Sequence, residues 1–425
     1  MSVRRRLNEI VWRFLDAALS EEGLEYWKRV PELPSAVRPR KHQHSRVAPR
    51  QQVRTTAPAA LQTSAGPIRD EDAAWEAFRQ APLRNFFQLY LDAEMWMFKC
   101  WTSWLAPVLP RYLRSLDRLA EVGKADPAPN PEPYTPERLS RLIRAEAARL
   151  GLTSVGFTAF DPRYIYGENA GEVETGSVIA CILEEHYESH ESIPGREHER
   201  GTFECYVSMF EMIGKLAEFI QGLGYRAQPQ GSGAPMLFIP FAVQAGLGQL
   251  GYNGQLLTPG AGARVTLSAI TTSAELAHDE PVDFGIPGIC AECKVCVRRC
   301  PVGAIPGTPA AHRGVTKAKL KTERCLPVVG QVEGCAVCVK VCPIQRFGLE
   351  AVIAHYNDTG QILGKDSDDL EGYRWPLDDR YYGAGEKPRI SSEQFLHPAR
   401  LDFDPSLQYQ PIPAETVIDN YVASK

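Results

Sequence analysis

Most of the cysteines in this 425-residue chain lie close together, between Cys290 and Cys342. The run "CAECKVCVRRCP" (290–301) has the spacing C-x2-C-x2-C-x3-C-P, and "CAVCVKVCP" (335–343) repeats its second part. A disulfide-linked secreted scaffold would be short and would spread its cysteines, whereas clustered thiols in a long chain indicate a metal site. The chain must therefore fold so that these two runs meet.

The cysteine spacing favours two [4Fe–4S] clusters. In bacterial two-cluster ferredoxins the fourth cysteine of each run ligates the other cluster. We therefore predict one cluster on Cys290, Cys293, Cys296 and Cys342, and a second on Cys325, Cys335, Cys338 and Cys300. The alternatives are a structural zinc site, which uses C-x2-C pairs and leaves the triple run unexplained, or disulfides. The remaining thiols, Cys100, Cys181 and Cys205, are expected to be ordinary buried side chains.

Composition and charge exclude several classes of protein. The hydrophobic fraction of 44% is that of a globular chain, and the net charge of −5 is spread along the sequence, which argues against a nucleic-acid footprint. The N-terminus carries paired arginines like an export signal, but Glu9, Arg13 and Asp16 interrupt what would be its apolar region. We interpret residues 1–33 as an amphipathic helix and predict a cytoplasmic protein.

Linkers divide the rest of the N-terminal region. Residues 34–74 are rich in Pro, Arg, Gln and Thr and are predicted to be a flexible arm. Residues 75–123 form an aromatic-rich helical segment that is interrupted by Lys99 and Pro107, so it is too charged and broken to span a membrane. It is expected to pack on the main body or on a partner in a homodimer, in preference to a peripheral membrane contact. The C-terminal segment, 349–425, is expected to cap the site or a cluster.

Residues 135–285 are predicted to form the main domain, followed by a ferredoxin-like module over 286–348. A helix is expected over 135–152 with Thr135 as its N-cap, and a second one over 203–222. Strand-like runs are "SVGFTAF", 177–185, "MLFIPFAV" and 264–272. Strands and helices do not alternate regularly, which favours an α+β fold. The histidines of "HYESH" (186–190) lack the zinc-hydrolase pattern and are expected in a loop or strand.

A glycine-rich stretch, "AGLGQLGYNGQLLTPGAGARV" (245–265), contains G-x-G-x-x-G at Gly246, Gly248 and Gly251. In a dinucleotide-binding loop the last glycine opens a helix, but here turn-forming residues follow. A nicotinamide site is therefore disfavoured. Backbone without Cβ atoms can instead lie flat against a large planar ligand.

The two clusters form an electron path. Ferredoxin clusters of this kind have potentials near about −400 mV, which suits a difficult reduction. A ferredoxin module occupies only a small part of the chain, so the residues upstream of it either accept those electrons or dock a partner.

Taken together, the cysteine runs and the preceding glycine stretch resemble the cobalamin-dependent reductive dehalogenases and, more distantly, the epoxyqueuosine reductases. The resemblance covers roughly residues 135–345. It implies an α+β, nitroreductase-like fold with a ferredoxin-like module, two [4Fe–4S] clusters and a base-off cobalamin against the glycine loop. The implied cofactor-binding residues are Thr202, Ser232, Gly246, Gly248, Gly251, Asn253, Gly254, Leu257 and Thr258.

The same resemblance implies the catalytic residues. Tyr206 in "CYVSM" matches the proton donor, and Arg264 in "GARV" matches the basic residue beside it. An adjacent guanidinium would stabilise the phenolate and lower the pKa of the tyrosine. Ser232, in "GSG" (231–233), replaces the amide that the respiratory members carry in "GND", so the substrate class stays open.

The implied activity is removal of halide from an organohalide. The electrons would come from reduced ferredoxin or flavodoxin. Two alternatives remain: reduction of a non-halogenated substrate such as an epoxide, or an electron-transfer or corrinoid-handling protein without its own substrate.

Overall fold

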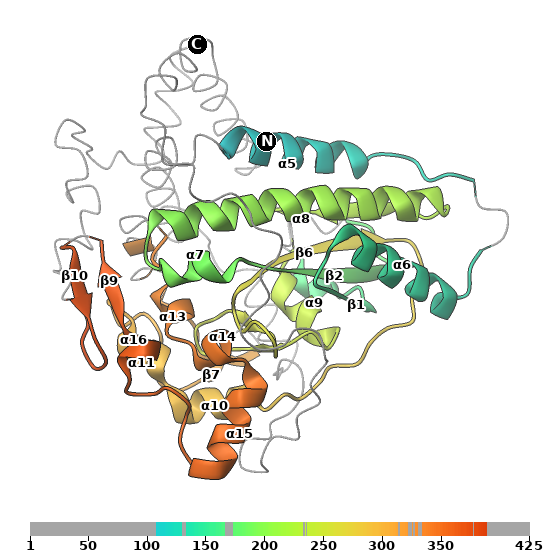
Figure 1. Cartoon of the computed structure of the whole chain (residues 1–425). Helices are drawn as coiled ribbons and strands as arrows, with labels where there is room; N and C mark the ends of the chain where they lie inside the picture. The colour runs from blue at the N-terminus through green and yellow to red at the C-terminus, as the bar shows by residue number, and fades with distance from the viewer. Residues whose placement is uncertain are drawn as a thin grey trace, which may run out of the picture.

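The computed structural model describes residues 108–388, apart from 130–132, 166–172, 233, 235, 313–314, 322–324, 326–327, 330–333 and 377 (Figure 1). The predicted N-terminal helix and flexible arm lie outside the described residues, as do most of the aromatic-rich segment and the chain after 388. In the described part of the chain, none of the helices is long and apolar enough to cross a membrane.

A four-stranded antiparallel sheet forms the first half of the described chain. Its strands are β1 (Ser154–Ala159), β2 (Ser177–Glu184), β6 (Val265–Thr272) and β3 (Ala227–Gln230), in that spatial order. Ile179 on β2 lies opposite Phe157 on one neighbour and Ile270 on the other. The short strand β3 escaped prediction because its sequence, AQPQ, has no apolar alternation.

Helices cover both faces of this sheet (Figure 1). On one face lie α5 (Leu109–Val122), α6 (Pro136–Leu150) and the long α8 (Arg196–Gly222), and α9 (Phe238–Gln244) lies on the other. Side chains of a strand alternate between faces, so Ile179, Cys181 and Leu183 join the core under α6 and α8. Ala180 and Ile182 join the core around α9. Burial on both faces explains the continuous apolar run of β2.

Local sequence signals predicted some helices and strands correctly and others wrongly. Helix α6 begins as predicted after Thr135, whose Oγ1 accepts from the backbone N–H of Arg138 at 3.4 Å. The prediction of a strand at "MLFIPFAV" is wrong, because most of it forms α9, whose Pro240 lies in the first turn, where no helical N–H is needed. The expected loop or strand for the "HYESH" histidines is wrong for His190, which lies in α7 (Tyr187–Glu191), whereas His186 lies in the loop before that helix.

The second half consists of short helices around its own core, which runs from Tyr252 to Tyr382. Its helices are α10 (Ile286–Cys293), α11 (Val295–Arg299), α13 (Val337–Lys340), α14 (Pro343–Phe347), α15 (Leu349–Thr359) and α16 (Asp368–Glu371). Small hairpins pair β4 (Gln249–Leu250) with β5 (Leu256–Leu257), β7 (Ala310–His312) with β8 (Val315–Lys317), and β9 (Tyr373–Trp375) with β10 (Arg380–Tyr382). A 3-10 turn, Pro162–Tyr164, follows β1. The α+β class is confirmed.

Candidate functional site: two cysteine groups beside a buried polar cluster

The first cysteine group surrounds one pocket. Cys290 and Cys293 lie on α10, Cys296 lies on α11, and Cys342 immediately precedes α14; all four line the pocket. Burial raises the pKa of the Cys290 thiol, while a hydrogen bond from the backbone N–H of Tyr252 opposes that shift. Backbone donors aimed at sulfur are what a buried thiolate bound to a metal requires.

The second group consists of Cys300, Cys325, Cys335 and Cys338. Burial raises the pKa of the Cys325 thiol to about 12, and the nearby charge of Cys300 adds to the shift. Burial also raises the pKa of Cys338 well above its usual value, with further contributions from Cys325, Cys335 and Cys300. Four thiolates this close repel one another, so together they need cations between them. The donor set therefore fits an iron–sulfur cluster.

The two C-x2-C loops share one local conformation. Lys294 has φ +52°, Ala336 has φ +51°, and each directly precedes the short helix that carries the next cysteine. Left-handed backbone at a non-glycine residue is uncommon. Its recurrence at matching positions shows that both runs turn their cysteines inward by the same local geometry.

The glycine loop adjoins the first cysteine group. Tyr252, Asn253 and Leu257 line the same pocket as its four cysteines. Gly262, at φ +55°, lies so close to the backbone of Gln345 that a Cβ would overlap it. The loop is therefore packed against the chain that follows Cys342, and the first group is the one that faces it, a point the sequence left open.

Only some of the loop glycines face open space. A Cβ at Gly246 would overlap the carbonyl oxygen of Glu280, one at Gly248 that of Leu257, and one at Gly251 the Leu257 side chain. These three glycines serve the packing of the loop itself. Gly254 and Gly260 have nothing within 4 Å of the Cβ position and leave room for a ligand.

Asn253 gives the loop an unused donor. Its side chain is 3% exposed, and its Nδ2 has no hydrogen-bond partner among the described residues. A buried unpaired amide N–H is costly unless a bound group accepts it. The open surface at Gly254 and this donor fit a planar cofactor with polar edges, whereas Thr258 is occupied within the loop, where its hydroxyl donates to the Gly262 carbonyl at 3.2 Å.

Tyr206 lies on α8 among aromatic rings. Its ring centroid is 6.2 Å from that of Tyr112, 5.9 Å from Phe203 and 6.0 Å from Phe210. Burial raises the pKa of Tyr206, and the charge of Glu185 raises it further. The expected lowering of this pKa by Arg264 is therefore not what the structure shows.

Arg264 is fully buried and its guanidinium is directed to other groups. Nη2 forms an ion pair with Glu184 Oε1 at 2.8 Å, and Nη1 donates to the carbonyl oxygen of Glu185 at 2.6 Å. The guanidinium carbon also lies 5.4 Å from the centre of the Tyr187 ring. The side chain is thus fixed by three partners at the end of β2.

Glu185 connects Thr202, one of the implied site residues, to Thr266 on β6. Its Oε2 accepts from the hydroxyl of Thr202 at 3.3 Å and its Oε1 from that of Thr266 at 2.8 Å. Burial raises the pKa of Glu185. Sequence analysis missed this residue, although a paired acid at the end of the apolar run "SVIACILEE" was a usable signal, because buried carboxylates are rare without partners.

The other implied contacts are more scattered. Ser232 is exposed just after β3, next to Gly231, whose Cβ position contacts the ring of Phe210. A different surface hollow lies at the β1 edge and is lined by residues 158–164 with Phe241 and Gln244. It contains none of the implied site residues, so the chemistry points to the cysteine pocket and the polar cluster instead.

Comparison with known proteins agrees with this assignment. Residues 289–345 match the 4Fe–4S dicluster domain family. The chain is 37% identical over 155 residues to a tetrachloroethene reductive dehalogenase of Dehalobacter restrictus, covering 36% of this chain and 27% of that enzyme. It is 34% identical over 181 residues to the enzyme of the same name from Sulfurospirillum multivorans, covering 40% of this chain and 36% of the relative.

A more distant likeness is to the epoxyqueuosine reductase of Escherichia coli, at 32% identity over 145 residues, which covers 31% of this chain and 37% of the relative. The matched part of the chain thus spans 27–37% of the length of these relatives. The resemblance to reductive dehalogenases, with epoxyqueuosine reductases as the more distant relatives, is confirmed.

Solved structures support the fold. A catabolic reductive dehalogenase, NpRdhA, in complex with 3-bromo-4-hydroxybenzoic acid matches with a TM-score of 0.53 at 22% identity, covering 60% of this chain and 39% of that one. A second reductive dehalogenase structure, described with a mechanism for B12-dependent dehalogenation, matches with a TM-score of 0.50 at 20% identity, covering 72% and 52%. The architecture is that of these proteins.

Proposed function

We propose that this chain is a cobalamin- and iron–sulfur-dependent reductase of the reductive dehalogenase type. Its substrate class would be an organohalide, and its electron donor a reduced ferredoxin or flavodoxin. The observation that carries the proposal is the shared pocket in which Tyr252, Asn253 and Leu257 of the glycine loop meet Cys290, Cys293, Cys296 and Cys342. The cysteines that would hold a low-potential cluster therefore lie next to the glycine loop that would bind the cofactor.

The two cysteine groups give the electron path a direction. The first group contacts the glycine loop, so its cluster would be the inner one, next to the cofactor. The second group, on Cys300, Cys325, Cys335 and Cys338, would be the outer one. The two groups are close enough for the charge of Cys342, in the first group, to contribute to the raised pKa of Cys338, in the second.

The loop would hold the cofactor by few contacts. Gly254 offers open backbone and Asn253 Nδ2 a buried unpaired donor, so these two residues are the best supported of the implied contacts. A base-off cobalamin would supply a cobalt centre that accepts low-potential electrons and delivers them to the substrate. Gly246, Gly248 and Gly251 would act indirectly, by allowing the loop to fold tightly.

Tyr206 would deliver the proton. Burial and Glu185 keep its phenol protonated at neutral pH, which is the form a donor needs. Arg264 would act as a positioning residue for the end of β2, because it is bound to Glu184 and the Glu185 carbonyl. Thr202, one helical turn before Tyr206, would fix the Glu185 carboxylate.

Cofactor content is the first test. Protein prepared anaerobically should contain about eight iron atoms per chain and take up about one cobalamin. Failure of iron-replete protein to take up any cobalamin derivative would refute the proposal and leave an iron–sulfur protein of other function.

Tyr206→Phe tests the proton step. We expect halide release from a chlorinated or brominated aromatic or alkene to fall by roughly 10²–10⁴-fold, the range of general acid catalysis, at unchanged iron and cobalamin content. Tyr134→Phe is the matched control and should keep its activity, because Tyr134 lies just before α6, where its ring packs beside Arg138 and is not among the described rings that contact Tyr206. Undiminished halide release in Tyr206→Phe would remove Tyr206 from the mechanism.

The likeness to epoxyqueuosine reductase supports one rival, reduction of a non-halogenated substrate. The same cobalamin-loaded protein should then reduce an epoxide while releasing no halide from a panel of organohalides. That outcome would keep the cofactors and change the substrate class.

A further inference from the structure

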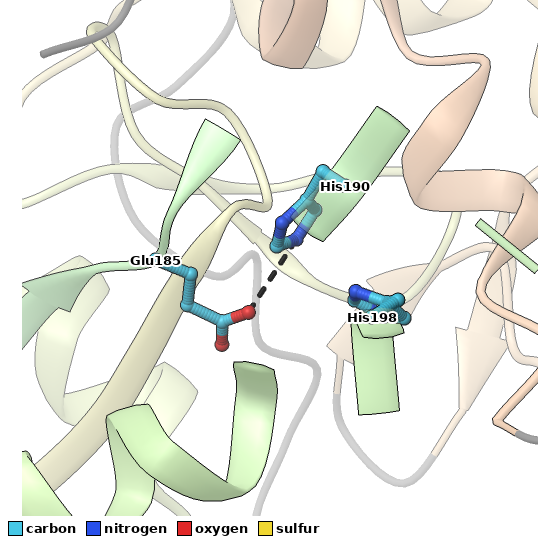
Figure 2. A group of neighbouring side chains, drawn as sticks. All are labelled: Glu185, His190 and His198. Carbon is cyan, nitrogen blue, oxygen red and sulfur yellow. Dashed lines mark ion pairs between the residues drawn. The ribbon is translucent and has the colours of Figure 1, made fainter. Parts of the chain in front are cut away.

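Three buried side chains from three separate elements meet beside Arg264. Glu185 follows β2, His190 lies on α7 and His198 lies in the first turn of α8. One potential ligand atom from each lies within 4.8 Å of the others, and all three residues are buried. Figure 2 shows the Glu185 carboxylate and a ring nitrogen of His190 facing one another, with His198 beside them.

The hydrogen bonds around His190 fix which of its nitrogens carries the proton. Nδ1 lies 3.2 Å from the carbonyl oxygen of His186, which can only accept. The hydroxyl of Ser189, 3.4 Å from Nδ1, donates its own proton to that same carbonyl at 2.8 Å. Nδ1 must therefore be the N–H, and Nε2 of the neutral ring presents a lone pair.

That lone pair points at an acceptor. Nε2 of His190 lies 3.4 Å from Oε2 of Glu185, so two electron pairs face each other unless a cation lies between them. In a tetrahedral zinc site with bonds of about 2.0–2.1 Å, neighbouring ligand atoms are about 3.3–3.4 Å apart. The spacing of this one pair, 3.4 Å, matches one edge of such a site.

The environment of His198 supports a metal site independently of the Glu185–His190 pair. It is 7% exposed, its Nδ1 has no hydrogen-bond partner in the described part of the chain, and its ring centre lies 4.6 Å from that of His190. A proton shared between Glu185 and His190 would satisfy those two alone. A metal ion would satisfy all three residues.

The surrounding groups match those of known metal sites. Ligating histidines usually donate their second N–H to a carbonyl or carboxylate, as His190 does to His186, and ligating carboxylates are themselves hydrogen-bonded, as Glu185 is to Thr266. The cations that act on the site are paired: Arg264 with Glu184 at 2.8 Å and Lys340 with Glu191 at 3.4 Å. They therefore add little net repulsion.

We propose that Glu185, His190 and His198 bind one divalent d-block cation, such as Zn²⁺, outside the iron–sulfur clusters. Two imidazoles and one carboxylate suit zinc and neighbouring first-row metals. The ion ties the end of β2 to α7 and α8, and so holds Arg264 and Thr202, which bond to Glu185, in place. Metal binding at this site requires neither the proposed cobalamin nor the substrate.

Zinc binding by the cluster-loaded protein tests the site. Full anaerobic reconstitution occupies the eight cysteines with iron, so they cannot capture the probe. After equilibration with Zn²⁺ and gel filtration, elemental analysis should find about one zinc per chain in addition to about eight iron. Titration calorimetry of His190→Gln and of His198→Gln should show zinc affinity lowered by at least about tenfold.

His278→Gln is the matched control, because His278 is an exposed histidine beside Ser177 and outside the three-residue group. It should bind zinc as the parent protein does. The result for a variant counts only if its iron content and its far-ultraviolet circular dichroism are unchanged. If a histidine variant does not fold, Glu185→Gln tests the same site through its carboxylate ligand. A parent protein that retains no zinc, or folded variants that retain it undiminished, would overturn the proposal. Cobalamin uptake plays no part in this outcome.

Discussion

The cysteine-bearing half and the sheet-bearing half of this molecule build their sites in opposite ways. In the first, Cys293 and Cys335 are each followed by one left-handed residue, and the short helix that begins after it carries Cys296 or Cys338. In the second, Glu185, His190 and His198 come from three consecutive elements, the end of β2, α7 and α8, which pack so that the three side chains meet.

This difference decides what each half tolerates. The cysteine groups have their geometry in the local backbone, and their stability depends on the iron that neutralises them. The polar cluster depends on buried charges that partner one another, with Arg264 between Glu184 and the Glu185 carbonyl. Loss of a ligand should empty a site in the first half, whereas loss of a partner should lower the stability of the second.

Removal of cysteine ligands from the two runs gives the largest expected effect. Cys300→Ser and Cys335→Ser should each lower iron from about eight to about four per chain, because they remove ligands of the same outer cluster. The double variant should still hold about four, while Cys300→Ser with Cys290→Ser should hold almost none. Iron analysis with electron paramagnetic resonance of the reduced protein measures this.

Cys181→Ala is the control for this series, since Cys181 is buried in the sheet. It should keep all its iron. If the Cys300→Ser/Cys335→Ser protein loses both clusters, the cross-ligated pairing is wrong and each run serves its own cluster.

Removal of the buried guanidinium gives the next largest effect. Arg264→Met leaves the Glu184 carboxylate and the Glu185 carbonyl without their partner in a buried setting, which typically costs about 3–5 kcal/mol. The free energy of unfolding from denaturant titration should fall by that amount, with iron content unchanged. Arg118→Met removes an exposed ion pair with Glu218 and should leave the transition where it was. Equal stability of the two variants would show that Arg264 does not organise this half.

More of the cysteine-bearing half than of the sheet-bearing half could be predicted from the sequence. The ligation pattern of bacterial two-cluster ferredoxins places Cys342 with the first run, and in the structure these four cysteines line one pocket. Capping chemistry placed the start of α6 at Thr135. These features are encoded by neighbours along the chain, and such signals are legible without tertiary structure.

Features that depend on tertiary packing were missed. Glu185 lies before α7 and His198 lies in the first turn of α8, and no periodicity of the sequence relates the two positions. The direction of the Arg264 guanidinium is set by Glu184 and Tyr187, not by Tyr206, and only the fold reveals that choice. The glycine pattern carried too little information to separate residues that pack inward from those that face open space.

The glycine loop joins the two halves and gives the smallest effect, which makes it the most selective test. At Gly248 a Cβ overlaps the carbonyl oxygen of Leu257, a backbone atom that cannot rotate away, so Gly248→Ala should cost about 1–3 kcal/mol. At Gly260 nothing lies within 4 Å, so Gly260→Ala should leave the free energy of unfolding of the cobalamin-free protein nearly unchanged. If the cofactor lies over this open surface, Gly260→Ala should weaken cobalamin uptake while iron stays at its full value. Reduced stability with normal uptake in Gly260→Ala would instead mean that this glycine, like Gly248, serves only the packing of the loop.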